Sequence, residues 1–283
     1  MKVTHILVAF CILFSSCQPS LDYNLSGYTQ KIIVEGYITS NDFAKVYLSF
    51  NIPLSQKIDS TQMLKNFISV AKVTVSDGIQ SEVLTGGYWN KNHFPPFYYS
   101  TTNLKGREGG TYTISVVYAG HELYAKTTIP YSDSVTNFQT TSVNDSMRML
   151  KMGIDINTNT KGAYRIYSLK PFENTFTPTP FLFNSDLSLK GYNVFAINPK
   201  PTQNMNSLKE SNLFRAGDAV LIQVDKMDSI STVFFKGISF GGDNGLGSDI
   251  FIGQKDVLKS NISSPGYGIW CGIARRTYPV EIK

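Results

Sequence analysis

Cysteine is scarce in this chain, which has three cysteines among 283 residues. Cys11 and Cys17 lie in an N-terminal segment that we expect to be removed or modified, so only Cys271 would remain as a thiol. An internal disulfide is then excluded, and an exported protein must be stabilised by buried apolar area instead. Cys271 lies in the apolar run Ile269–Ile273, where we expect a small buried hydrophobic residue rather than a reactive thiol.

Histidine is equally scarce, with three residues in the chain. His5 lies in the N-terminal segment, and His93 and His121 are too few for a three-histidine zinc site. The segment Gly237–Gly241 matches the nucleophile elbow of serine hydrolases, but no histidine follows it as that fold requires. The acidic, glycine-rich segment Asp243–Asp249 lacks the spacing of a helix-loop-helix calcium site, because a glycine occupies a ligand position. We therefore predict no catalytic residue, no metal and no cofactor.

Long hydrophobic runs and runs of one charge are also lacking. The net charge is +5, without a cluster of Lys and Arg that would follow a phosphate backbone, so nucleic acid is not an expected partner. The N-terminal apolar run Ile6–Phe14 is far shorter than the ~20 residues that span a bilayer. We interpret this run as part of a cleaved signal rather than as a membrane anchor.

The N-terminal segment has the layout of a bacterial lipoprotein signal. Lys2 precedes the apolar run, and the small residues of Ser15-Ser16-Cys17 follow it. We predict a signal peptide over residues 1–16, lipidation of Cys17 and a lipid-anchored tether over residues 17–28. An ordinary secretory signal, in which Cys17 is incidental, is the alternative. Two or more acyl chains would hold the protein stably on a membrane.

Alternation of apolar and polar residues predicts strands over most of the remaining chain. The pattern is clear in Tyr112–Tyr118 and Leu123–Thr127, which flank Gly120, and in Ala71–Val75, which precedes Asp77-Gly78. Both regions are typical of β-hairpins. Strands expected later in the chain are Tyr164–Leu169, Tyr192–Ile197, Ala219–Asp225, Tyr267–Ile273 and Tyr278–Ile282.

We predict a mainly β protein with two β-sandwich-like domains. The first, over residues 29–130, would be an immunoglobulin- or transthyretin-like sandwich, and the second a β-rich domain over residues 131–283. The segment Pro130–Ser134 interrupts the strand pattern and places the boundary. At most one or two short helices are expected, in the second domain. Asp228-Ser229 favours a helix start before Gly237, although a strand fits this segment nearly as well.

Several strand and turn sequences resemble those of a known family. In chain order they are Ile32–Ile38, Gly110–Ile114, Gly120–Ala125, Thr128–Pro130, Phe214–Asp218, Asn261-Ile262 and Gly266–Ile269. With the lipoprotein signal, their order makes the chain resemble the Bacteroidota outer-membrane lipoproteins grouped as domain of unknown function 4249 (DUF4249). The resemblance implies an envelope lipoprotein, often associated with TonB-dependent transporters, and it carries over no catalytic residue.

The segment Tyr88–Tyr99 is rich in aromatic residues and is the main candidate for binding. Prolines hold it extended, so that its rings would contact a ligand or a partner with little loss of entropy. In the alternative interpretation, these rings cover an open end of the sandwich. A second and weaker candidate is the aromatic and proline-rich segment Phe172–Phe183. The candidate binding residues of the main segment are Tyr88, Trp89, His93, Phe94 and Phe97.

These observations favour a non-enzymatic outer-membrane lipoprotein that is an accessory or cargo-binding partner of a TonB-dependent transporter. The face of the membrane that displays it, periplasmic or cell-surface, stays open. A surface adhesin or structural envelope lipoprotein without a small ligand is the alternative. An envelope hydrolase would need a pair of carboxylates that spacing alone does not reveal.

Overall fold

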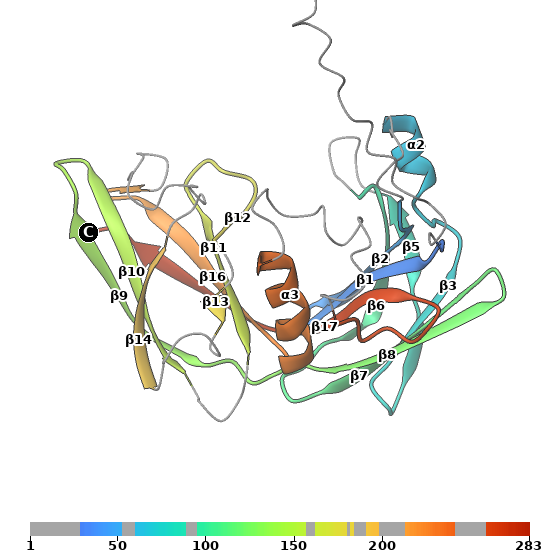
Figure 1. Cartoon of the computed structure of the whole chain (residues 1–283). Helices are drawn as coiled ribbons and strands as arrows, with labels where there is room; N and C mark the ends of the chain where they lie inside the picture. The colour runs from blue at the N-terminus through green and yellow to red at the C-terminus, as the bar shows by residue number, and fades with distance from the viewer. Residues whose placement is uncertain are drawn as a thin grey trace, which may run out of the picture.

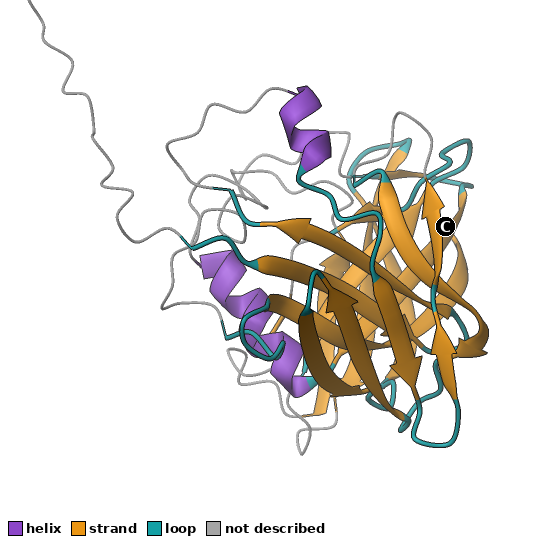
Figure 2. Cartoon of the chain, turned by 90° about the vertical axis from the view of Figure 1, so that its right-hand side faces the viewer, coloured by secondary structure: helices purple, strands orange, loops and turns teal. Residues whose placement is uncertain are grey.

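The computed structural model describes residues 29–52, 60–88, 95–156, 162–179, 182–183, 191–197, 213–240 and 259–283. The predicted signal and tether, with Cys17, lie outside these ranges, as do Trp89, His93 and Phe94. The described chain is mainly β, with three open sheets and two short helices (Figures 1 and 2). The predicted fold class is therefore confirmed.

One large sheet of nine strands forms the centre of the molecule. Eight of its strands follow one another in hydrogen-bonded order, and β13 (Leu182–Phe183) pairs separately with β11. The order is β12 (Thr177–Pro178), β11 (Ala163–Leu169), β16 (Ala219–Met227), β17 (Tyr267–Glu281), β1 (Ile32–Thr39), β2 (Phe43–Phe50), β6 (Phe97–Lys105) and β5 (Thr85–Tyr88).

Strand β17 connects the two halves of this sheet. Its first part, Tyr267–Ile273, pairs in parallel with β1, and its second part, Ile273–Glu281, pairs antiparallel with β16. Gly268 has φ +126°, and a Cβ atom there would lie 2.0 Å from the carbonyl oxygen of Val34. Only glycine allows the two backbones to approach so closely at the start of the parallel pair. In Figure 1, β17 runs from one half of the molecule into the other.

The segment that carries the predicted domain boundary is anchored to the large sheet. Asp133 forms an ion pair of 2.7 Å with Lys226 of β16, and both side chains are about 95% buried. Tyr164 of β11 donates a hydrogen bond to the same carboxylate. The boundary between residues 130 and 131 stays a prediction, while the sheet itself is continuous between the two parts of the chain.

Two four-stranded sheets pack against one face of the large sheet, one in each half. The first has the order β4 (Ser81–Val83), β3 (Lys72–Ser76), β7 (Thr111–Tyr118), β8 (His121–Thr128). The second has the order β14 (Gly191–Ile197), β10 (Met147–Ile156), β15 (Phe214–Arg215), with β9 (Ser134–Ser142) also paired to β10.

The first core confirms the predicted hairpins. Val73, Val75, Ile114 and Leu123 point inward and are at most 2% exposed, as the alternation predicts. Trp270, from the C-terminal strand, is fully buried in the same core, and its indole donates to the carbonyl oxygen of Tyr112 at 3.1 Å. The C-terminal strand therefore completes the N-terminal core. The second core is built from Leu150, Met152, Ile154, Tyr164, Ile166, Phe214, Val220 and Ile222.

Helix α3 (Ser229–Phe240) begins where the sequence predicts a helix start, with Asp228 as its N-cap. The Asp228 carboxylate accepts hydrogen bonds from the backbone N–H and the hydroxyl of Ser231, both at 2.7 Å. Phe234 and Phe235 bury the helix against the opposite face of the large sheet, and this packing outweighs the weak helix propensity of the segment. The second helix, α2 (Ser60–Lys65), lies in the N-terminal half, where no helix was predicted.

Candidate functional site

The β5–β6 hairpin carries the described part of the predicted aromatic site. Tyr88 pairs with Phe97 across the hairpin, and the two rings lie 5.2 Å apart between centroids. Tyr88 is 59% exposed and Phe97 is half-buried. The structure therefore brings these two candidate residues together at the surface, whereas the remaining three candidates lie outside the described residues.

A shallow groove of about 300 Å³ lies beside this aromatic pair. A Cβ atom at position 87 would lie 2.4 Å from the ring of Tyr98, so a larger residue there would displace that ring. Tyr99, by contrast, is 4% exposed and donates to the carbonyl oxygen of Ile68 at 3.0 Å, so it belongs to the core. The groove is lined by Ser69, Gly86, Gly87, Tyr88, Phe97, Tyr98 and Tyr99.

The hairpin lies at the end of the large sheet, and the part of β6 that follows it is anchored by Glu82. Strand β5 is the last strand in the hydrogen-bonded order. The Glu82 carboxylate accepts hydrogen bonds from the backbone N–H groups of Thr102 at 2.6 Å and Leu104 at 2.7 Å, which ties β4 to β6. An aromatic pair on such a scaffold loses little conformational freedom when it binds.

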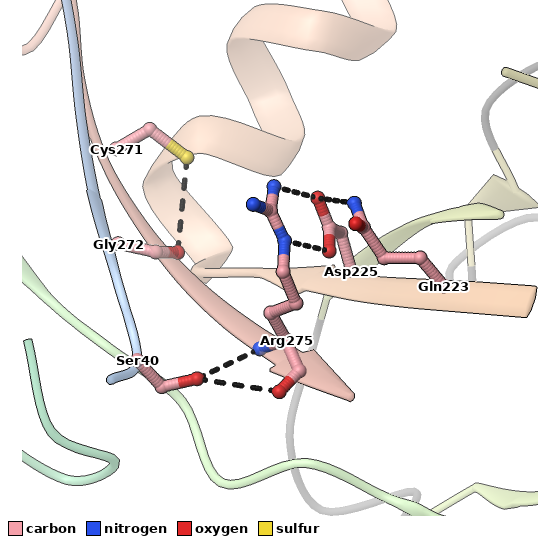
Figure 3. A network of polar contacts seen from close by, with 6 residues as sticks. All are labelled: Ser40, Gln223, Asp225, Cys271, Gly272 and Arg275. Carbon is pink, nitrogen blue, oxygen red and sulfur yellow. Dashed lines mark hydrogen bonds and ion pairs between the residues drawn. The ribbon is translucent and has the colours of Figure 1, made fainter. Parts of the chain in front are cut away.

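A buried polar network on the α3 side of the large sheet was not predicted (Figure 3). Arg275 of β17 donates two hydrogen bonds, of 2.8 and 2.7 Å, to the carboxylate of Asp225 on β16. Asp225 is 1% exposed and also accepts from the amide of Gln223 at 3.2 Å. Burial raises the pKa of Asp225, and the Arg275 guanidinium opposes that rise. Ser40 accepts a hydrogen bond from the backbone N–H of Arg275 at 2.9 Å, which adds β1 to the network.

The adjacent Asp228 connects three elements. Besides capping α3, its carboxylate accepts from the hydroxyl of Thr127 on β8 at 2.7 Å and from the backbone N–H of Gly272 on β17 at 3.0 Å. Cys271 beside it is fully buried, as the sequence predicts, and burial raises the pKa of its thiol well above the ordinary value. These contacts hold the helix, the large sheet and the small N-terminal sheet together.

Glu35 and Tyr37 of β1 lie on the same face of the sheet as Cys271. The Tyr37 hydroxyl donates to the Glu35 carboxylate at 2.5 Å. Burial raises the pKa of Glu35, and the hydrogen bond from Tyr37 only partly offsets that rise. In the sequence, Glu35 is an acid within an apolar strand, and alternation allows it to lie on a solvent-exposed face.

Two further observations concern the part of the chain that the structure describes. Within it, no three side chains among His, Cys, Asp and Glu gather closely enough to hold a metal ion. No described helix combines the length and the apolar character needed to cross a membrane.

In the second aromatic candidate segment, Phe172 is completely exposed and Phe176 is half-buried.

The comparison with protein families gives one result. The family model described as "Domain of unknown function (DUF4249)" matches residues 18–277. It confirms the resemblance carried by the strand and turn sequences. None of the curated proteins matches the chain.

Proposed function

The chain belongs to the DUF4249 family, and from this premise we propose that it is a non-enzymatic, lipid-anchored outer-membrane protein that assists a TonB-dependent transporter or binds its cargo. The signal pattern that ends at Cys17 supports the anchor. The family resemblance supports the membrane and the kind of partner. The aromatic hairpin supports a binding role.

The exposed Tyr88–Phe97 pair carries the proposal. A tyrosine that is 59% exposed adds little to the stability of the fold, since its ring stays largely in water. The groove beside it includes Gly86, where a Cβ atom would meet nothing within 4 Å, so other chemical groups can approach the backbone there. Aromatic rings on a rigid surface are favourable contacts, because they bury a large area at low entropic cost.

The role of the anchor can be tested by metabolic labelling with a radioactive fatty acid. The wild-type chain should incorporate the label and fractionate with outer membranes, and the Cys17→Ser variant should do neither. Labelling of the variant, or an unlabelled wild-type chain, would contradict the lipid anchor.

The role of the partner can be tested by affinity purification of the lipidated protein from native outer membranes, followed by mass spectrometry. A TonB-dependent transporter recovered in a near-stoichiometric amount is the expected result. Recovery of the chain alone, in detergents that keep other transporter complexes intact, would refute the accessory role and favour a stand-alone adhesin or structural protein.

A further inference from the structure

The N-terminal segment joins the fold at a fixed point of the N-terminal half. The Asn51 side chain, at the end of β2, accepts a hydrogen bond from the backbone N–H of Lys31 at 2.7 Å and donates one to the carbonyl oxygen of Thr29 at 3.2 Å. The backbone N–H of Asn51 also donates to the carbonyl oxygen of Lys31 at 3.2 Å. The chain that follows Cys17 therefore enters the large sheet at one defined end, where β1 begins and β2 ends.

Helix α2, which projects from the N-terminal half in Figure 1, lies at this same end. The segment after the helix pairs with the last residues of β2. The backbone N–H of Phe50 donates to the carbonyl oxygen of Asn66, and that of Ile68 donates to the carbonyl oxygen of Leu48, both at 2.9 Å. Because Phe50 precedes Asn51 in the chain, the end of α2 lies beside the point where the N-terminal segment enters the fold.

Large apolar side chains are exposed at this end. Met63 and Leu64 of α2 are 40% and 48% exposed, and Val70, in the segment that follows, is 81% exposed. The charged residues within 29–31, 51–52 and 60–71 are Lys31 and Lys65, and both are basic. We call these three described segments the anchor end. Exposed apolar residues next to lysines suit a membrane surface, because the apolar groups enter the acyl region while the ammonium groups stay in the polar layer.

The predicted tether keeps the anchor end close to lipid. Residues 18–28 separate Cys17 from Thr29, and a chain of this length spans at most about 40 Å when it is fully extended. Strand β3 begins directly after the anchor end, at Lys72, and carries the chain about 16 Å away over its five residues. An acylated Cys17 therefore brings the anchor end to the membrane before the turn that follows β3. A tether of this kind also raises the local concentration, so that weak apolar contacts suffice.

We propose that the anchor end rests on the bilayer that holds the acylated Cys17, with Met63, Leu64 and Val70 in contact with the acyl region. The inference rests on the lipid anchor of the proposed function and adds the orientation of the fold on the membrane. Three exposed side chains are too few for a stable interface between copies of the chain, which buries about 800 Å² on each partner. A bilayer to which the chain is already attached requires no such area.

This orientation also places the aromatic hairpin near the membrane. Ser69 belongs to the anchor end and lines the same groove as Tyr88 and Phe97. The exposed ring pair is then close to the membrane surface, within reach of a partner embedded in the same bilayer.

Quenching of a fluorescent label by lipid tests the orientation. Met63→Cys is the test variant and Ile79→Cys is the control, because Ile79 is 86% exposed on the turn that follows β3. A nitrobenzoxadiazole label attaches at these positions alone, since Cys271 is fully buried and the acylated Cys17 has no free thiol. The lipidated, full-length chain would be reconstituted in vesicles of phosphatidylethanolamine and phosphatidylglycerol that contain a spin-labelled phosphatidylcholine. Both labelled chains should melt as the wild type does, because neither side chain belongs to a core.

The label at position 63 should be quenched at least about threefold more strongly than the label at position 79, because only position 63 lies at the depth of the acyl chains. Equal quenching at the two positions would overturn the proposal. Blue-shifted emission at position 63 without quenching would overturn it as well, since a second copy of the chain would then cover the surface. A large drop in melting temperature for the chain labelled at position 63 would assign Met63 to the fold and overturn the docking role.

Flotation of the vesicles separates this inference from the proposed function. A chain that floats with the vesicles but is not quenched at position 63 overturns the orientation and leaves the lipid anchor intact. A chain that does not float refutes the anchor, and the orientation with it.

Discussion

Replacement of Asp228 by alanine tests how the helix, the large sheet and the small N-terminal sheet are joined. Asp228 is 8% exposed, and its carboxylate accepts four hydrogen bonds, two from Ser231 and one each from Thr127 and Gly272. Loss of the N-cap costs about 1 kcal/mol. The buried hydroxyls of Thr127 and Ser231 then lose their acceptor, at about 1–3 kcal/mol for each group left unsatisfied. Gly272 is protected, because its N–H also donates to the Thr127 hydroxyl at 2.9 Å.

The expected loss for Asp228→Ala is therefore about 3–7 kcal/mol, a large part of the 5–15 kcal/mol that stabilises a typical domain. Equilibrium unfolding in urea measures it. Asp77→Ala is the matched control, because Asp77 accepts two backbone hydrogen bonds of 2.9 Å in an exposed turn, and its loss should cost about 1 kcal/mol or less. Equal losses in the two variants would refute the reasoning, since they would show that burial of the Asp228 network adds nothing.

Two further predictions follow from buried titratable groups. Burial raises the pKa of Glu35, so the native state binds the proton of this carboxyl group more tightly than the unfolded state does. The contribution of Glu35 to the free energy of unfolding therefore falls as pH rises above 4.5, the ordinary pKa of glutamate. Glu35→Gln keeps an acceptor for Tyr37 and should melt higher than wild type at pH 7 but not below pH 4.5; a melting-temperature difference that is constant with pH would contradict this. The Cys271 thiol, buried and with a raised pKa, should resist a thiol reagent at pH 8 until the chain unfolds in urea. Rapid labelling of the native protein would contradict that expectation.

Local patterns predicted the local structure well. The hairpin of β7 and β8 follows from strict alternation around a glycine turn, and the start of α3 follows from one capping aspartate. Helix α2 was not predicted, because its six residues are too few to show the periodic apolar positions of an amphipathic helix. Met63 and Leu64 within it are exposed.

Contacts between distant parts of the chain were not predictable in the same way. The sequence predicts two separate strands within Tyr267–Ile282, whereas the structure has a single strand, β17, over Tyr267–Glu281. Its parallel partner β1 lies more than 200 residues earlier, and no local pattern encodes that pairing. For the same reason the Asp225–Arg275 pair was missed: alternation gives the face of each strand but not the neighbouring strand.

The candidate site was predictable in part. Aromatic composition identified the segment that contains Tyr88 and Phe97, and the structure places the two rings together at the surface. Composition also identified the segment that begins at Phe172, but the positive φ of that residue depends on a turn that only coordinates reveal. Tyr99, which is not among the candidate binding residues, is buried, whereas Tyr88 is exposed.

The most direct test of a binding role for the hairpin compares two tyrosine variants of the lipidated protein. Tyr88→Ser changes the hairpin, and Tyr124→Ser changes a strand residue of similar exposure, 51% against 59%. Both should leave the free energy of unfolding within about 0.5 kcal/mol of wild type. The amount of transporter recovered per molecule of chain should fall at least about tenfold for Tyr88→Ser and stay unchanged for Tyr124→Ser. Equal recovery by the two variants, or a large loss of stability in Tyr88→Ser, would contradict the account and assign the hairpin rings to the fold.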